Sequence, residues 1–318
     1  MSDKSREDAY AGRPPIADDA SVAPFQKGDY DRDVAQFTRD IANDPTNTAA
    51  YRNRGFAHYL NDDFDLSIAD YTEAIRIDPA DGRAYEGRAL AFEDKEQWAQ
   101  AVSDYGEVIR RDPAAADAYT ARGRLHFFRT TQYDQAIADF NEAIRLDPKP
   151  SNYYDRGRAH QKKGNVDSAI SDFSEAIRLD PNKATVSSCT PDAFAARGKS
   201  WAGIGELDRA IADFGEAIRL GRDLFADRGL ALKAKGDHAP AIANFDRALE
   251  RPLPPKDAAT IRCARGQCHL VTGAFKLAVA DFVEAIRLNP TDTAAHQALD
   301  LARSQQRSRF WFALFRRP

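Results

Sequence analysis

The chain has 318 residues and a nearly balanced charge, with 45 Lys and Arg against 49 Asp and Glu. This balance argues against a protein whose whole surface is a nucleic-acid footprint, although local basic patches remain compatible with it. The three cysteines, Cys189, Cys263 and Cys268, indicate reduced thiols in a cytoplasmic protein, and predict neither a disulfide framework nor a zinc site. We find no signal-peptide pattern and no apolar run of about 20 residues, so we expect no membrane span.

Two stretches precede the main pattern of the chain. Residues 1–25 are rich in Asp, Ala, Pro and Ser without periodicity, which predicts a disordered N-terminal arm. Residues 28–45, GDYDRDVAQFTRDIANDP, predict one amphipathic helix around Phe37. Prolines at 14, 15 and 24 break any helix before it, so this helix has no preceding partner.

From Thr48 onward the chain repeats itself about every 34 residues. The segment AISDFSEAIRLDP, ending at Pro181, returns as AIADYTEAIRIDP, AIADFNEAIRLDP and AVADFVEAIRLNP, which end at Pro79, Pro148 and Pro290. A fixed period of this length is typical of proteins built by stacking small structural units.

Each unit has the pattern of two helices joined by a polar elbow. In residues 150–183, Ala169, Phe173 and Ala176 form one apolar stripe on the second helix, which an Asp-Pro pair then ends. Gly157 lies in the middle of the first helix, where glycine costs roughly 1 kcal/mol against alanine. We therefore expect Gly157 to allow close approach of the second helix, at the small surface of Ala169 and Ala176.

This pattern resembles the tetratricopeptide repeat (TPR), whose signature places aromatic, Leu-Gly, aromatic, Ala, aromatic, Ala and Pro residues at fixed offsets. The resemblance runs continuously over residues 48–292 and implies an all-α fold, a right-handed superhelical α-solenoid of helical hairpins. It implies a solenoid at 26–307 with a half-repeat at 28–45 and a capping helix at 292–306, followed by an aromatic and basic tail at 308–318. The seven full repeats are residues 48–81, 82–115, 116–149, 150–183, 191–221, 222–255 and 259–292.

Positions are numbered so that the first-helix glycine is position 8 and the proline is position 32. Position 7 is arginine in every repeat, and position 23 of the second helix is aspartate in all but the sixth, which has Asn244. A cation and a carboxylate on facing helices predict a ladder of ion pairs, with a weaker rung at Asn244. The alternative is a row of ligand-binding arginines. These arginines are Arg54, Arg88, Arg122, Arg156, Arg197, Arg228 and Arg265.

Four histidines, His58, His126, His160 and His269, share position 11. Stacked histidines raise the hypothesis of a metal site. Neighbouring helices pack about 10 Å apart, however, whereas zinc needs its ligand nitrogens within about 2.1 Å. We therefore expect these histidines to serve packing, and we expect no metal and no other cofactor.

In proteins of this family the ligand lies in a concave groove lined by first-helix positions 2, 5, 9, 12 and 13. The resemblance implies a groove that is basic in repeats three to five and aromatic toward its N-terminal side. It would suit a protein or peptide partner with carboxylates and apolar anchors; the alternative is solvated charges without a dedicated ligand. The predicted groove residues are Phe56, Tyr59, Arg124, Phe127, Phe128, Tyr154, Arg158, Lys162, Lys199 and Lys233.

One binding mode of the family is not supported. Chaperone-binding members clamp a C-terminal carboxylate with Lys at position 5 and Asn at position 9 of one repeat, then Asn at position 6 of the next. Here those positions hold Arg52, Phe56 and Gly87.

The final segment, SRFWFALFRRP, places Phe310, Trp311, Phe312 and Phe315 among arginines. It is too short to span a bilayer. Its alternatives are packing onto the last repeat as part of the cap, anchoring at a membrane interface, or docking to a partner.

The sequence contains no nucleophile elbow, phosphate loop or metal motif, so it predicts no enzyme. We expect a non-catalytic scaffold or adaptor that binds a peptide or helix of a partner protein. The alternative is a membrane-associated assembly factor anchored through the tail. RNA binding along the basic groove is disfavoured by the acidic overall charge. The expected location is cytoplasmic, or peripheral to a membrane for the alternative.

Overall fold

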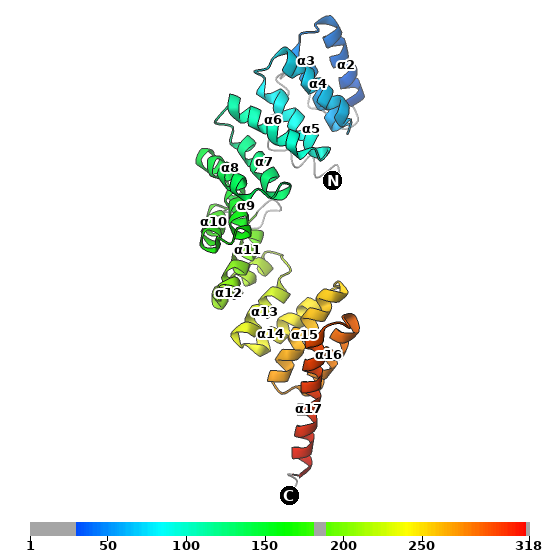
Figure 1. Cartoon of the computed structure of the whole chain (residues 1–318), viewed down its shortest axis with the longest axis vertical. Coiled ribbons are helices and arrows are strands. Elements are labelled where there is room, and N and C mark those ends of the chain that lie inside the picture. Colours follow the sequence, from blue (N-terminus) through cyan, green and yellow to red (C-terminus); the bar gives the residue numbers. More distant parts are fainter. Residues whose placement is uncertain (1–29, 181–188, 316–318) are drawn as a thin grey trace. The chain divides into compact units, whose positions relative to one another are not determined.

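The computed structural model describes residues 30–180 and 189–315, with side chains as far as residue 308. Sixteen helices and no strand form this part of the chain (Figure 1). The predicted all-α repeat architecture is therefore confirmed. The predicted arm at 1–25 lies outside the described residues. Contacts divide the chain into two compact units, Met1–Pro148 and Lys149–Pro318.

The first unit stacks three helical hairpins behind a single leading helix. Each hairpin packs its first helix on its second, and α2 packs on α3. The first helices α3 and α5 of successive hairpins also touch. The helices are α2 (Tyr30–Asn43), α3 (Thr48–Leu60), α4 (Phe64–Ile77), α5 (Gly82–Asp94), α6 (Trp98–Arg111), α7 (Ala116–Phe128) and α8 (Tyr133–Leu146).

The second unit stacks four hairpins followed by one long helix. Here α9 touches α11 and α13 touches α15, so first helices again lie side by side. The helices are α9 (Pro150–Lys162), α10 (Val166–Leu179), α11 (Thr190–Gly203), α12 (Leu207–Arg219), α13 (Phe225–Lys235), α14 (His238–Leu249), α15 (Pro255–Val271), α16 (Phe275–Leu288) and α17 (Thr293–Phe315).

The elbow inside each hairpin requires one residue with positive φ. The hairpins of the second unit place glycine there, as at Gly164 with φ +79°. The hairpins of the first unit use Asp62, Glu96 and Thr131 instead, at φ 64°, 58° and 53°. Because a Cβ crowds the backbone in this region, and a branched one most of all, the Thr131 elbow is strained.

The core of each hairpin is the aromatic ring at position 24, which is almost fully buried in all seven repeats. Gly157 is indeed a site of close approach, because a Cβ there would lie 2.8 Å from the Phe173 ring and 3.1 Å from Cβ of Asp172. The nearest groups to this Cβ are the Phe173 ring and Asp172, which the sequence did not predict. Ala169 and Ala176, the predicted small surface, are fully buried.

The second repeat departs from this arrangement in a way that its neighbour explains. Its position 8 is Ala89, and its glycine has moved to Gly87. A Cβ on Gly87 would lie 2.3 Å from Tyr71, the position-24 ring of the preceding repeat. A tyrosine is longer than the phenylalanine of most other repeats, so Gly87 makes room for its hydroxyl end.

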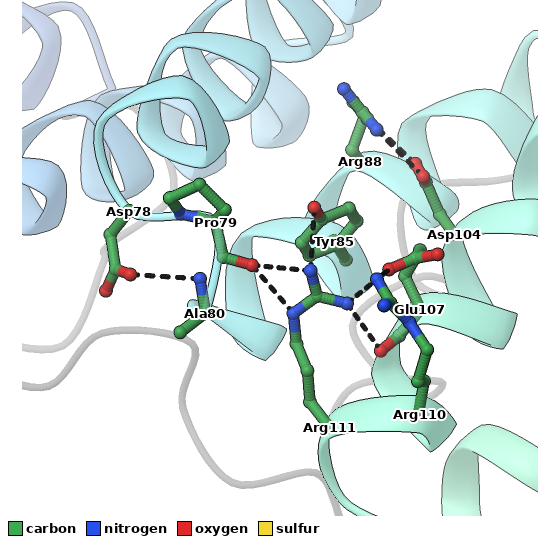
Figure 2. Close-up of polar contacts among 9 residues, drawn as sticks. All are labelled: Asp78, Pro79, Ala80, Tyr85, Arg88, Asp104, Glu107, Arg110 and Arg111. Atoms are coloured by element: carbon green, nitrogen blue, oxygen red, sulfur yellow. Dashed lines mark hydrogen bonds and ion pairs between the residues drawn. The ribbon is translucent and has the colours of Figure 1, made fainter.

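Arg111, at the end of α6, ties two repeats together (Figure 2). Its Nε donates to the Pro79 carbonyl at 2.8 Å, and its guanidinium lies 4.0 Å from the centre of the Tyr85 ring. The same group donates to the Tyr85 hydroxyl at 2.9 Å and to the Glu107 carbonyl at 2.9 Å. One side chain therefore satisfies a carbonyl of the inter-repeat turn, where backbone groups otherwise lack partners.

The last helix is longer than predicted. α17 begins at Thr293, where the Asp292 carboxylate accepts from the N–H groups of Ala294 and Ala295, and runs to Phe315 (red in Figure 1). We expected an end near 306 and a separate tail from 308. No Pro or Gly interrupts residues 293–315, so nothing in the sequence stops the helix. The side chains of Phe310, Trp311, Phe312 and Phe315 lie outside the described residues.

Candidate functional site

The predicted ion-pair ladder is present. In six repeats the position-7 arginine donates through Nε and Nη2 to both oxygens of the position-23 aspartate of its own hairpin. Every one of these aspartates is almost fully buried. Because the guanidiniums are already paired, they are not free to bind a ligand, which rejects the alternative of a ligand-binding row. The pairs are Arg54–Asp70, Arg88–Asp104, Arg122–Asp139, Arg156–Asp172, Arg197–Asp213 and Arg265–Asp281.

Several of these arginines also reach back to the preceding second helix, at position 25. Arg88 Nη1 donates to the Thr72 hydroxyl at 3.1 Å, and Arg197 Nη1 donates to the Ser174 hydroxyl at 2.9 Å. These rungs therefore join their own two helices and the previous repeat. Such links between neighbours are what stabilises a stacked array.

We call each arginine–aspartate pair a rung. In four rungs the position-11 histidine lies beside the aspartate. The Nε2 atoms of these histidines lie 3.9–4.0 Å from the same aspartates that hold the arginines. Burial lowers the pKa of His160 and of His269, and the nearby aspartate opposes that shift. The histidines are mostly buried, as packing predicts. Within the described residues, no group of three His, Cys, Asp or Glu side chains is placed to hold a metal ion.

The predicted groove residues of the first unit divide into core and surface. Tyr59 and Phe127 are buried, at 5% and 6% exposure, and Tyr59 donates to the Asp94 carboxylate. Phe56 is partly buried, whereas Arg124 and Phe128 are exposed. The Phe128 and Phe127 rings pack edge to face, with their centres 4.7 Å apart. In this unit, then, Arg124 and Phe128 offer the most surface to a partner.

The second unit holds the other five, on three successive first helices. Arg158 lies 5.7 Å from the centre of the Tyr154 ring on α9. Lys162, one turn further along α9, and Lys199 on α11 are exposed. Lys199 Nζ lies 3.8 Å from an Asp227 oxygen of α13, and Lys233 of α13 donates to a glutamine of α15.

These contacts link successive first helices of the second unit. We call the exposed side chains of α9, α11, α13 and α15 the first-helix face. Gln161 of α9 donates to Ser200 of α11 at 3.0 Å, which continues the chain of contacts across the remaining pair of helices. Two carboxylates near this face already have cationic partners, because Asp192 pairs with Arg222 and Asp223 pairs with Arg251.

Sequence reasoning missed the apolar part of this face. Leu230 on α13 and Val271 on α15 are 44% and 66% exposed. They occupy positions 9 and 13, which the family resemblance had indicated as groove positions, so the signal was available. The first-helix face therefore passes from cationic on α9 and α11 to apolar on α13 and α15.

No helix in the described part of the chain has the length and apolar character needed to cross a membrane.

Comparison with known proteins identifies the repeat. Family models described as tetratricopeptide repeat match residues 86–152 and 226–293 in one case, and residues 48–81 and 150–183 in the other. No curated protein matches the chain.

Solved structures show the same fold at low identity. YrrB, described as a TPR protein with an unusual peptide-binding site, is 22% identical with a TM-score of 0.53, over 64% of this chain and 99% of that one. The C-terminal part of a TPR repeat-containing protein from Cytophaga hutchinsonii is 16% identical with a TM-score of 0.54, over 85% and 95% of the two chains. A tetratricopeptide repeat protein from Parabacteroides merdae is 16% identical with a TM-score of 0.53, over 85% and 99%.

Proposed function

Because the chain belongs to the tetratricopeptide repeat family, we propose that it is a non-catalytic scaffold that binds a peptide or helix of a partner protein on the first-helix face. The observation that carries this proposal is the occurrence of cations and exposed apolar side chains on first helices of one unit. Exposed Lys162 and Lys199, with half-buried Arg158, supply the charge, and Leu230 and Val271 supply the apolar contact.

The chemistry of this face selects its partner. Exposed cations steer a partner segment that carries carboxylates, and apolar side chains then hold it by burial. A partner segment with Asp or Glu at one end and aliphatic or aromatic anchors at the other would match both parts. YrrB, whose description names a peptide-binding site, supports the premise that this fold can accept a peptide. Arg124 and Phe128 of the first unit would form a second, smaller contact of the same chemistry.

The test is a selection of random peptides displayed on phage against the full chain. We expect enrichment of segments that combine acidic and apolar residues. The triple variant Arg158→Glu, Lys162→Glu and Lys199→Glu should lose these peptides and keep its circular dichroism spectrum.

The matched control reverses three exposed arginines on second helices of the same unit: Arg178→Glu, Arg219→Glu and Arg287→Glu. Each pairs only with a glutamate three residues before it, and the charge change equals that of the triple variant. Retained binding in the first-helix variant, or equal loss in both variants, would place the binding surface elsewhere.

The second candidate is a membrane-associated assembly factor that uses residues 308–318. It is favoured by the unbroken course of α17 to Phe315, since a helix can lie in a membrane interface with aromatic residues buried and arginines at the surface. Co-sedimentation with anionic vesicles, with and without residues 308–318, tests it. Equal sedimentation of both chains would reject this candidate. A steep salt dependence of RNA affinity would instead support RNA binding.

A further inference from the structure

The sixth repeat breaks the rung that the other six share. Arg228 donates through Nε to the Asn244 side-chain oxygen at 2.7 Å, where other repeats offer a carboxylate. Asn244 turns its own amide nitrogen to the Pro240 carbonyl, at 2.8 Å. The Arg228 guanidinium therefore has one neutral acceptor in place of two anionic oxygens.

The second link of the rung is missing as well. In the fifth repeat, Arg197 donates to Ser174 at position 25 of the preceding second helix. In the sixth repeat the corresponding residue, which faces Arg228, is Gly215. A Cβ built on Gly215 would lie 3.6 Å from Arg228 Nη1, so this nitrogen faces a glycine that offers it no side-chain acceptor. Arg122 also faces a glycine, Gly106, but keeps its aspartate. Among the seven described rungs, only that of Arg228 lacks both the position-23 aspartate and a side-chain acceptor at position 25 of the preceding helix.

The two terminal nitrogens of Arg228 consequently form an unoccupied fork. Neither is enclosed away from solvent. Burial lowers the pKa of this guanidinium, whereas the partner carboxylate raises the pKa of Arg54, Arg88, Arg122 and Arg265. A partly desolvated cation without an anion is an unfavourable arrangement, and an external anion would relieve it.

A second cation contacts the same aromatic ring as Arg228. Position 26 is glutamate in the other six repeats but Arg247 in the sixth. Both arginines contact the Phe225 ring, whose centre lies 5.7 Å from the Arg228 guanidinium and 5.8 Å from that of Arg247. Arg247 pairs with Glu250 at 3.0 Å, and both of these side chains are more than half exposed. The sixth repeat has thus lost two carboxylates around its rung and gained a guanidinium.

We infer that Arg228 and Arg247, with Asn244 and Phe225, form a binding site for a phosphate group, either free or carried by a phosphorylated side chain of a partner. Guanidinium forks bind phosphate oxygens in pairs, and two cations suit a dianion better than a carboxylate, which carries one charge. The site uses positions 4, 7, 23 and 26, so it is separate from the first-helix face.

The test uses the full chain and inorganic phosphate as the probe. We expect a saturable change in the Nε–Hε resonance of Arg228 on titration with phosphate at pH 7.5, at ionic strength held constant with sodium chloride. The variant Arg228→Lys assigns that resonance. Asn244→Asp installs the carboxylate found in the other rungs, so it should fold normally and weaken phosphate binding about tenfold or more.

A second arm distinguishes the source of the phosphate. A phosphoserine peptide that binds more tightly than its unphosphorylated twin, in an Asn244-dependent way, identifies a phosphorylated partner; equal binding of the twins with retained phosphate binding identifies a free ion. Arg247→Glu, which restores the residue of the other repeats, should weaken binding, and Arg287→Gln should not. No saturable response, or an unchanged response in Asn244→Asp, would overturn the site. Loss of peptides from the first-helix face has no bearing on this result.

Discussion

Arg197 and Asp213 are joined by two parallel hydrogen bonds, from Nε and Nη2 of the guanidinium to the two carboxylate oxygens, each 2.8 Å long. The arginine lies on α11 and the aspartate on α12, with only 6% of Asp213 exposed. Ser174 of the preceding second helix accepts from the same guanidinium. The pair therefore joins three helices, so its loss should loosen the array locally.

Asp213→Asn tests the rung directly. It copies the sixth repeat into the fifth, removes one charged acceptor and leaves a partly buried guanidinium. We expect a loss of about 1–3 kcal/mol in local stability. Hydrogen exchange of the α11 and α12 amides measures it, because repeat arrays need not unfold as a single unit.

The control for this change lies on the same helix. Asp208 is 82% exposed and pairs with Lys235 at the surface, where ion pairs contribute little. Asp208→Asn should leave amide exchange unchanged. Equal effects of the two substitutions would show that the buried rung does not stabilise the hairpin.

Gly157→Ala should destabilise the protein although alanine is the better helix former. Its Cβ would meet the Phe173 ring at 2.8 Å, and forcing a methyl group into a packed core costs about 1–3 kcal/mol. Gly106→Ala is the matched change, because its Cβ would meet Arg122 Nη1 at an ordinary 3.5 Å. That variant should gain up to about 1 kcal/mol. Urea midpoints that shift in the same direction for both would contradict the packing argument.

The histidines of two rungs predict a dependence of stability on pH. Burial lowers the pKa of His160 and His269 below the ordinary 6.5. The unfolded chain therefore takes up protons first as the pH falls, and the folded state loses stability below about 6.5. Asp172, Arg156 and Lys163 act on His160.

The double variant His160→Gln and His269→Gln should flatten this response. We expect its urea midpoint to fall less than that of the natural chain between pH 7 and pH 5. Aspartate protonation affects both proteins at lower pH, so the comparison ends there. Identical slopes would mean that these imidazoles titrate as they do in the unfolded chain.

The elbow at Thr131 offers a stabilising substitution. Thr131 has φ 53°, and its hydroxyl makes only an exposed bond to the Thr130 carbonyl. The left-handed conformation costs an L-residue about 1–2 kcal/mol, so Thr131→Gly should raise the melting temperature, with a net gain of about 1 kcal/mol. Gly164→Thr, at the equivalent elbow of the fourth repeat, should lower it. A lower melting temperature for Thr131→Gly would show that the elbow is not strained.

The sequence by itself determined the repeat, the hairpins and the rungs. Arginine at position 7 and the residue at position 23 recur 16 residues apart, or 17 in the third repeat, so the period places both at the same level of every hairpin. The weak rung at Asn244 followed from the same reasoning. Periodicity alone assigns such residues because each helix repeats its geometry.

Only the tertiary structure decided which side chains are buried by neighbouring helices and which remain exposed to solvent. Tyr59 and Phe127 occupy groove positions by number but are buried, while Leu230 at another groove position is exposed. The Phe173 ring lies nearest to Gly157, and α17 continues past its predicted end. Position within a period sets the direction of a side chain from its helix axis. Whether a neighbour covers it depends on the size of the residues that meet it from other helices, and packing alone settles that.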